Sequence, residues 1–215
     1  MGALVADALA VYGHRVDELG LATEHDMVLA FLQAEVDSPR FGPAVAGVLQ
    51  ALGLTRALID QPDLMSEQEN GQRILVLANT RGYRINRYLF TGFPCEATTW
   101  RRVGLGRDDF PLLRYCNEQG APGFVQLTGG TRRVVDAAAN FERITTDAHK
   151  HVKPVVTALR AGQTYPPLIA VESGVGDLIM VEGYTRATAH AVVGPTAPVE
   201  FFIGRCPDLS QWPFY

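Results

Sequence analysis

A short polar segment between two apolar runs has the residue types of a phosphate site. It consists of Glu182, Gly183, Tyr184, Thr185 and Arg186, and we call it the EGYTR segment. The run 178–181 before it predicts a buried strand, and the run 187–193 after it predicts a helix. The first N–H groups of a helix lack internal acceptors, and the helix dipole adds about half a positive charge there. We therefore expect main-chain N–H groups, the threonine hydroxyl and the guanidinium to bind phosphate.

Glu182 is the candidate catalytic residue of this segment. A carboxylate at the end of a strand could bind Mg²⁺ or accept a proton from a substrate hydroxyl. The alternative is that it orients Arg186 or caps the helix. His190 comes one helical turn after Arg186 and is a weaker candidate for substrate contact, with a surface or core histidine as its alternative.

A second segment repeats the pattern. Residues 127–140 and 181–194 share an expected strand, a Gly-x-Thr-Arg core and an expected helix. The core of the first copy, which we call the GGTR turn, is Gly129, Gly130, Thr131 and Arg132. Its glycines would let the backbone approach a ligand closely. We expect it to form a second phosphate-binding wall of one cleft; the alternative is chance similarity between two ordinary turns.

The EGYTR segment resembles the ParB/sulfiredoxin superfamily. In that superfamily the nucleotide site lies where a strand turns into a helix through a Gly-x-x-Arg pattern, here Gly183 to Arg186. The acidic residue before the glycine, here Glu182, is similar to the Asp-Gly-His-His-Arg motif of the free-serine kinase branch. A helix, a glycine turn and a proline-led strand precede the motif in both, and the resemblance covers about residues 98–204.

The departures from the superfamily narrow this expectation. Sulfiredoxin needs a cysteine inside the motif, whereas this chain has Tyr184 and Thr185 there, so we do not expect sulfinic acid reduction. Chromosome-partition ParB proteins have a more arginine-rich motif and a following helix-turn-helix domain, whereas this chain ends at Tyr215, shortly after the expected motif helix. The serine kinase branch has two histidines where this chain has Tyr184 and Thr185.

The resemblance implies a nucleotide, ATP or CTP, together with Mg²⁺. In phosphoryl transfer the protein mainly positions the reactants and neutralises charge, and Gly183, Thr185 and Arg186 suit both tasks. We expect Mg²⁺-dependent phosphoryl transfer to a small hydroxyl-bearing metabolite. One alternative is a non-catalytic ATP- or CTP-binding switch or partner-binding protein, and a further one is a nucleic-acid-associated ParB-like protein.

Composition sets the outer limits of these expectations. The 215 residues are 47% hydrophobic and 20% charged, which predicts a globular protein with one or two cores. A net charge of −4 argues against general nucleic-acid affinity, although basic residues gather at positions 101, 102, 107, 132 and 133. Three cysteines without metal-ligand spacing predict neither a metal site nor a disulfide framework. Without a basic signal region or an uncharged apolar span, we expect a cytoplasmic protein that does not enter membranes.

The order of elements predicts an α+β fold with a small mixed sheet of the ParB/sulfiredoxin-like type, preceded by a helical N-terminal layer. We expect helices within residues 3–58 and at 73–80, with a polar connection at 60–72. The proposed division is 1–95 and 96–215, unless both parts form one compact unit. Strands are expected at 99–105, 123–128, 167–171, 178–181 and 199–203, and helices at 109–117, 133–145, 147–161 and 185–193.

The last residues are rich in aromatic side chains, including Trp212, Phe214 and Tyr215. Aromatic groups at a chain end are expected to pack on the protein rather than lie in water. We expect them to dock on the helical half of the same chain; a homodimer contact is the alternative.

Overall fold

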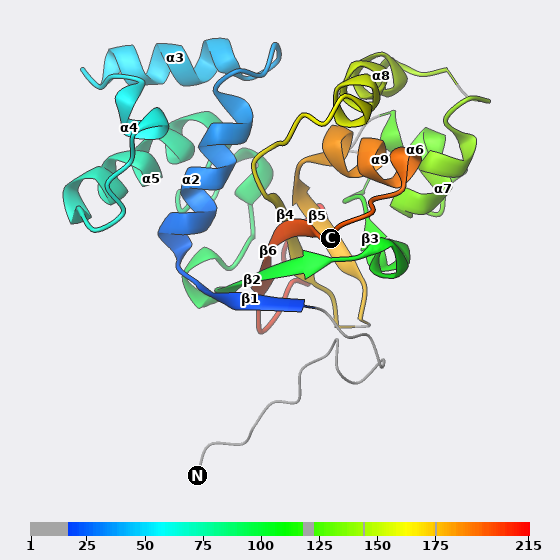
Figure 1. The fold of residues 1–215 in the computed structure, drawn as a ribbon. Helices are drawn as coiled ribbons and strands as arrows, with labels where there is room; N and C mark the ends of the chain where they lie inside the picture. Colours follow the sequence, from blue (N-terminus) through cyan, green and yellow to red (C-terminus); the bar gives the residue numbers. More distant parts are fainter. Residues whose placement is uncertain (1–16, 118–122, 144, 175) are drawn as a thin grey trace.

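The computed structural model describes residues 17–117, 123–143, 145–174 and 176–215. Six strands form one mixed sheet in the order β1-β2-β6-β4-β5-β3. Their bounds are β1 (Asp17–Ala22), β2 (Thr99–Leu105), β3 (Leu113–Arg114), β4 (Leu168–Glu172), β5 (Leu178–Glu182) and β6 (Val199–Arg205). The predicted α+β class with a small mixed sheet is confirmed. Figure 1 shows the helices in two groups, with β4 and β5 between them.

The middle of the sheet consists of apolar strands. All five residues of β4 are buried, as are the first four of β5, which agrees with strands covered on both faces. β4 pairs in parallel with β6 and antiparallel with β5, while β3 adds a short parallel edge to β5. The strands expected at 99–105, 167–171, 178–181 and 199–203 are confirmed, with shifts of a residue or two at their ends.

The helical layer follows β1. It contains α2 (Glu24–Glu35), α3 (Gly42–Ala51), α4 (Ala57–Asp60) and α5 (Glu67–Arg81). Thr23 and Asp26 cap α2 reciprocally, because the hydroxyl accepts from the Asp26 N–H (3.2 Å) and the carboxylate accepts from the Thr23 N–H (2.8 Å). The apolar side of α2 is completely buried and contacts β2 and β4 as well as α5. This layer is therefore joined to the sheet by a shared core.

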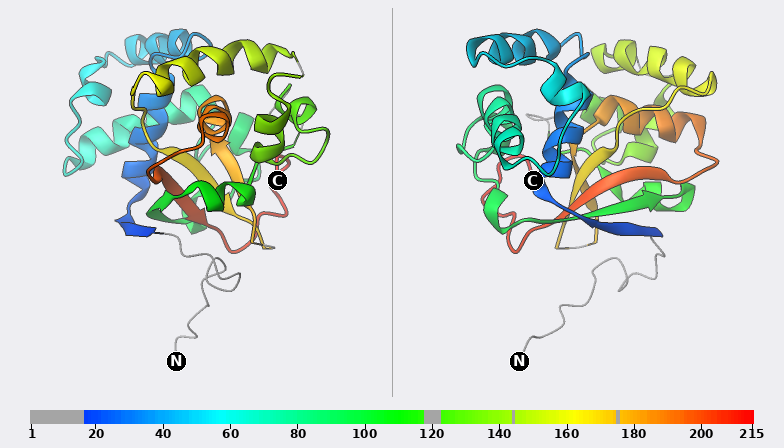
Figure 2. Two further views of the ribbon diagram at one scale, coloured as in Figure 1. Left: turned by 45° about the vertical axis from the view of Figure 1, so that its right-hand side comes forward. Right: turned by 60° about the vertical axis from the view of Figure 1, so that its left-hand side comes forward.

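The second group of helices surrounds α9 (Tyr184–Val193), which follows β5 directly. Its other members are α6 (Phe124–Leu127), α7 (Val134–Asn140) and α8 (Asp147–Arg160). Both α7 and α8 pack on α9, and the two views of Figure 2 show α9 between α8 and the sheet. The expected helices at 147–161 and 185–193 are confirmed, whereas the one expected at 133–145 is shorter and ends at Asn140.

Two predictions for the N-terminal half are wrong. Residues 17–22 were expected in a helix but form β1, an exposed edge strand that is held by antiparallel pairing with β2. The polar connection expected at 60–72 ends early, because Ser66 caps α5 by accepting from the Glu69 N–H (3.2 Å) and the helix starts at Glu67. The expectation for residues 3–16 lies outside the described residues.

Two further predictions are wrong between β2 and α7. The helix expected at 109–117 is a 3₁₀ helix, η3 (Arg107–Leu112), followed by β3, and Pro111 is one residue that cannot continue an α-helical ladder. The strand expected at 123–128 is the single turn α6. Phe124 and Leu127 are both buried. A short apolar run of this kind is compatible with a strand or with one turn of helix, and here it forms the turn of helix.

The C-terminal segment docks on the helical half, as the sequence predicts. The Trp212 indole is 2% exposed, donates to the Leu89 carbonyl (2.7 Å) and meets the Phe93 ring edge-on at 5.3 Å. Leu89 belongs to the 3₁₀ helix η1 (Tyr88–Phe90), which is followed by a second one, η2 (Cys95–Ala97). A side chain on Gly92 would overlap the Gln211 carbonyl, so the two segments touch through backbone as well.

One hydrophobic cluster contains side chains from both sides of the expected boundary at residues 95 and 96. Met27 and Phe31 of α2 belong to it together with Ile169 of β4 and Phe201 of β6. The division into two parts stays a prediction. Within the described ranges, no helix has the length and apolar character needed to cross a bilayer.

Candidate phosphate site at the start of helix α9

The EGYTR segment lies where the sequence places it, at the junction of β5 and α9. Glu182 is the last residue of β5, and a register shift in the pairing with β4 occurs at this end of the strand. Gly183 precedes α9 in the left-handed conformation (φ 94°, ψ 26°). A side chain here would overlap Leu168 Cδ2 and lie 3.1 Å from the Arg186 guanidinium. Only glycine satisfies both the backbone conformation and the available space.

Arg186 is buried and already has partners within the protein. Its guanidinium donates to the Pro166 carbonyl and to the Glu182 carboxylate, and the residue is 8% exposed. This contact with Glu182 is the one expected if the carboxylate orients Arg186, and a catalytic role of Glu182 stays a prediction. An arginine has five N–H donors in a planar fork, so these two contacts leave donors for a further anion.

Tyr184 is directed into the protein. Its hydroxyl lies 2.8 Å from Cys116 Sγ, and its ring packs edge-on against Tyr115 at 6.0 Å and Phe124 at 5.8 Å. The phenol is thus a packing group at this junction, and the backbone N–H is what Tyr184 can offer to a ligand. Thr185 is partly exposed, so its hydroxyl is reachable from solvent.

His190 lies one turn further along α9 and is partly buried. Burial lowers the pKa of its imidazole to about 4, and the neighbouring Arg186 charge lowers it further. The ring is therefore neutral at physiological pH. It could donate or accept a hydrogen bond, but it would not supply positive charge to a phosphate.

The GGTR turn differs from the expected copy of this junction. It follows α6 rather than a strand, and Arg132 has a left-handed backbone (φ 64°). Gly129, Gly130 and Thr131 are exposed. The Thr131 hydroxyl donates to Asp136 (2.5 Å), and Arg132 Nε donates to the Tyr115 carbonyl (3.0 Å).

The GGTR turn is nevertheless linked to α9 through two consecutive residues. Tyr115 accepts from Arg132, and the next residue, Cys116, contacts the Tyr184 hydroxyl. The Arg132 charge lowers the pKa of the Cys116 thiol, although burial, the larger effect, raises it to about 11. These contacts connect the GGTR turn to α9 through the interior of the protein, and the shared cleft stays a prediction.

Two charged residues of the helical layer complete this junction, and the sequence did not single them out. Glu35 ends α2, Arg81 ends α5, and Arg81 Nε lies 3.3 Å from Glu35 Oε1. The Arg81 guanidinium also lies over the Phe41 ring at 4.1 Å from its centroid. Its charge acts on Glu182 and Tyr184 of the EGYTR segment. We call Glu35, Arg81, Glu182 and Arg186 the junction charge cluster.

Burial dominates the electrostatics of this cluster. It raises the pKa of Glu35 to about 8; the Arg81 charge opposes the rise and the Glu182 charge adds to it. Burial also raises the pKa of Glu182, against the charges of Arg186 and Arg81. Among the described residues, neither Glu35 Oε2 nor Arg81 Nε has a hydrogen-bond partner, although both atoms are buried. Buried polar atoms of this kind are candidates for ligand contact.

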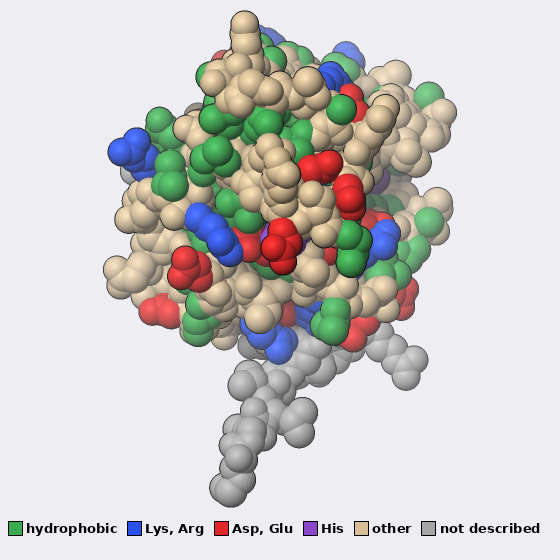
Figure 3. Space-filling view, turned by 90° about the vertical axis from the view of Figure 1, so that its left-hand side faces the viewer, with side chains coloured by type: hydrophobic (Ala, Val, Ile, Leu, Met, Phe, Trp, Pro, Cys, Tyr) green, Lys and Arg blue, Asp and Glu red, His purple; other side chains and the backbone are tan. Residues whose placement is uncertain are grey.

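Two of the five basic residues noted in the sequence are paired with acids. Arg101 contacts Glu18 and Glu172, and Arg102 contacts Glu200. Figure 3 shows acidic and basic side chains interspersed on the face it presents. This pairing leaves Arg107 as the member of the group at 101–107 that has no carboxylate partner among the described residues.

No protein-family model, curated protein or solved structure matches this chain. The resemblance to the ParB/sulfiredoxin superfamily therefore rests on the EGYTR segment and the order of elements around it. What the structure defines is an α+β protein with a strand-to-helix junction at which Glu182 and the buried Arg186 form an ion pair.

Proposed function

We propose that the chain binds a nucleoside triphosphate, ATP or CTP, at the start of α9 and transfers a phosphoryl group to a small hydroxyl-bearing metabolite. One observation supports this most strongly. The Glu182–Arg186 ion pair lies at a helix N-terminus whose Gly183 has no space for a side chain, and the charges of the Glu35–Arg81 pair act on Glu182. Phosphate recognition needs this combination of free N–H groups, positive charge and close backbone approach.

The buried atoms without partners suit a nucleotide and Mg²⁺. Glu35 Oε2 could accept a hydrogen bond from a hydroxyl or a metal-bound water, while Arg81, whose Nε faces Glu35 Oε1 at 3.3 Å, has further N–H groups for a phosphate oxygen. Mg²⁺ is commonly bound by one or two carboxylates together with substrate phosphates, so Glu35 and Glu182 would be enough protein ligands. The described residues contain no larger group of metal-ligating side chains. When bound, the metal would neutralise charge on the transferred group.

Among the described residues, Glu35 is suited to move a proton. A carboxyl group with a pKa of about 8 exchanges its proton near physiological pH, which is the condition for an effective general acid or base. Arg186 and Arg81 would hold the phosphates, and Glu182 would keep Arg186 oriented. The Arg186 guanidinium is buried and that of Arg81 is partly buried, so each charge has a larger effect than it would in water.

A non-catalytic nucleotide switch is the second candidate, and the Glu182–Arg186 ion pair is what favours it. Because Glu182 already neutralises Arg186, an incoming phosphate would have to compete with this carboxylate. Exchange of one anion for another at the junction of two helical groups could then change how the helical layer packs on α9.

Calorimetric titration with ATP and CTP in the presence of Mg²⁺ tests binding, and a panel of hydroxyl-bearing metabolites then tests turnover. We expect saturable binding that weakens at least tenfold in Arg81→Met. Arg56→Met is the matched control, since Arg56 pairs with Asp37 and Asp60 on the surface. Binding without turnover would favour the switch, and absence of binding to either nucleotide would refute both. DNA binding at physiological salt would instead support the nucleic-acid alternative.

A further inference from the structure

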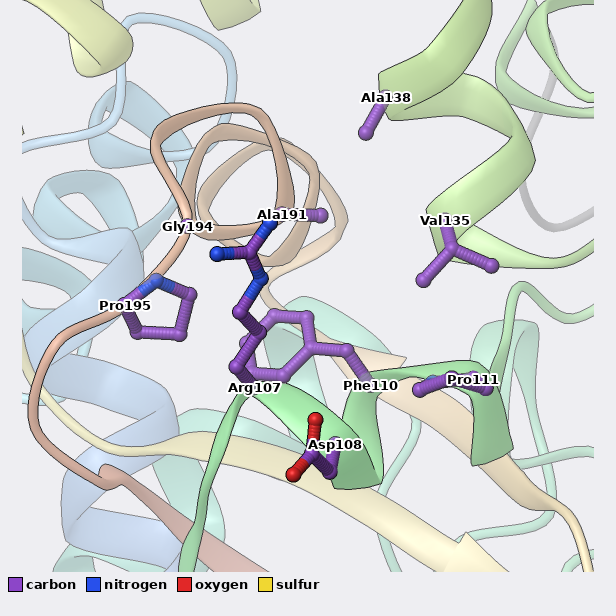
Figure 4. Close-up of a pocket in the computed structure, with 9 residues that line it drawn as sticks. All are labelled: Arg107, Asp108, Phe110, Pro111, Val135, Ala138, Ala191, Gly194 and Pro195. Carbon is purple, nitrogen blue, oxygen red and sulfur yellow. The ribbon is translucent and has the colours of Figure 1, made fainter.

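A pocket lies at the opposite end of α9 from the EGYTR segment. It has a volume of about 350 Å³, at the lower end of the range of small-molecule sites. Three elements form its walls: η3, α7, and the end of α9 with the following turn. Figure 4 shows the space between these elements, with the pocket side of α9 represented by Ala191, Gly194 and Pro195.

Most of the pocket surface is apolar. Phe110 and Pro111 lie on one side, while Val135 and Ala138 of α7 face them from the other. The Phe110 ring is fixed from behind by the Phe201 ring, which it meets edge-on at 6.4 Å. A rigid aromatic and aliphatic wall of this kind favours the hydrocarbon part of a ligand.

Arg107 is the cationic group of this pocket. Its side chain is exposed and, among the described residues, it has neither a carboxylate within ion-pair distance nor a hydrogen-bond acceptor. Figure 4 shows the guanidinium beside Gly194 and Ala191, and the Asp108 carboxylate beyond the Phe110 ring. Arg107 and Asp108 form no ion pair although they are neighbours in sequence. The guanidinium therefore keeps its planar donor fork for an external anion.

Small residues keep the space in front of Arg107 open. Gly194 has a left-handed backbone (φ 72°), and a Cβ added there would lie 3.8 Å from the guanidinium carbon. Ala191 and Ala138 present single methyl groups on the two helices. Larger side chains at these positions would fill the pocket or cover the guanidinium.

We propose that this pocket is a second ligand site, which binds a small organic carboxylate with an apolar body. The carboxylate pairs with Arg107, and the hydrocarbon part enters between α7 and α9. This site does not depend on the nucleotide function proposed for the other end of α9, because it shares no lining residue with the EGYTR segment. A carboxylate is favoured over a bulkier polar anion because Arg107 is the one cationic group among the described residues that line the pocket, and Phe110, Val135 and Ala138 provide apolar walls.

Benzoate and benzamide test the proposal on the unmodified protein, because the two molecules have nearly the same shape and differ in charge. We expect benzoate to shift the amide NMR signals of Val135, Ala191 and Gly194 saturably and to bind at least tenfold more tightly than benzamide. Equal affinities would overturn the carboxylate assignment. Absence of saturable shifts at about 10 mM, well above the millimolar affinity expected of so small a ligand, would overturn the site itself.

Two variants locate the binding further. Arg107→Gln should lower benzoate affinity to that of benzamide, and Ala138→Leu should abolish binding of both by filling the pocket. Arg102→Gln is the matched control, since it also removes one exposed positive charge but lies on β2 beside Glu200. Unchanged benzoate binding in Arg107→Gln, or an equal loss in Arg102→Gln, would contradict the proposal. Amide spectra of each variant without ligand show whether it is folded.

Discussion

The EGYTR segment and the GGTR turn share Gly, Thr and Arg at the same spacing, yet their surroundings differ. The first follows a buried strand, its glycine is enclosed by Leu168 and Arg186, and its arginine is 8% exposed. The second follows a short helix, a Cβ added to either glycine would meet nothing within 4 Å, and its threonine contacts an aspartate. The comparison teaches that a short pattern predicts a phosphate site only when burial and charge agree with it.

The largest difference is expected from the two arginines. Arg186→Met would leave Glu182 without its partner in a buried position, and breaking such a pair lowers the free energy of unfolding by about 3–5 kcal/mol. Arg132→Met removes one hydrogen bond to the Tyr115 carbonyl and should lower the free energy of unfolding by about 1 kcal/mol. Urea unfolding measures both values. The double variant Arg186→Met with Glu182→Gln should recover part of the stability lost in Arg186→Met. Equal effects of Arg186→Met and Arg132→Met would remove the distinction between the junctions.

The glycines should show the next largest difference. Gly183→Ala combines a left-handed backbone with a clash against Leu168, so we expect a loss of about 2–4 kcal/mol. Gly129→Ala has the backbone strain (φ 63°) without the clash, and a loss of about 1–2 kcal/mol is expected. Thermal and urea unfolding of the two variants provide the test. A smaller loss for Gly183→Ala than for Gly129→Ala would show that the junction is not enclosed as described.

The pH dependence of stability distinguishes the junctions by their titratable neighbours. Burial raises the pKa of Glu35 from its ordinary 4.5 to about 8, so the folded state holds a proton that the unfolded state releases. Stability should therefore fall as pH rises from 4.5 to 8, by at most about 1.4 kcal/mol per pH unit from this group. Urea unfolding of Glu35→Gln across this range should give a flatter profile and a higher stability at pH 8. An unchanged slope would contradict the buried, protonated state of Glu35.

The smallest effect is expected from the phenol of the EGYTR segment. Tyr184→Phe loses the contact with Cys116 (2.8 Å) and should lower the free energy of unfolding by about 1 kcal/mol. Because the ring is directed toward Tyr115 and Phe124, nucleotide affinity should not change. Calorimetry on this variant measures both consequences. A tenfold loss of nucleotide affinity would mean that the side chain, rather than the backbone, contacts the ligand.

Much of the α9 junction could be predicted from sequence because its signals are local. An apolar run of strand length, a glycine and a run of helix-forming residues specify β5, the turn and α9 in order. The same reasoning located β2, β4, β6 and α8. Each of these elements buries a continuous face, so that its pattern of apolar residues reflects its own packing.

The remaining elements depend on contacts with distant residues. β1 has almost no buried residue and is a strand because β2 pairs with it. Leu113 lies in β3 because β5 is beside it, and no local pattern contains that information. Glu35 and Arg81 join the candidate site only when α2 and α5 end near α9. The available signal in the sequence was a glutamate at the end of an apolar helix. Glu35 is buried there, and glutamate is rarely buried without a partner.

The most direct test of the nucleotide site is an amide NMR titration with ATP and Mg²⁺, followed by CTP. The account predicts saturable shifts at Tyr184, Thr185 and Arg186, with larger changes than at the amides of the GGTR turn, because the first junction combines the start of α9 with the buried Arg186. Shifts of similar size at Thr131 and Arg132, with the same affinity, would extend the site to the shared cleft. No shift at residues 184–186 with either nucleotide would contradict the central claim.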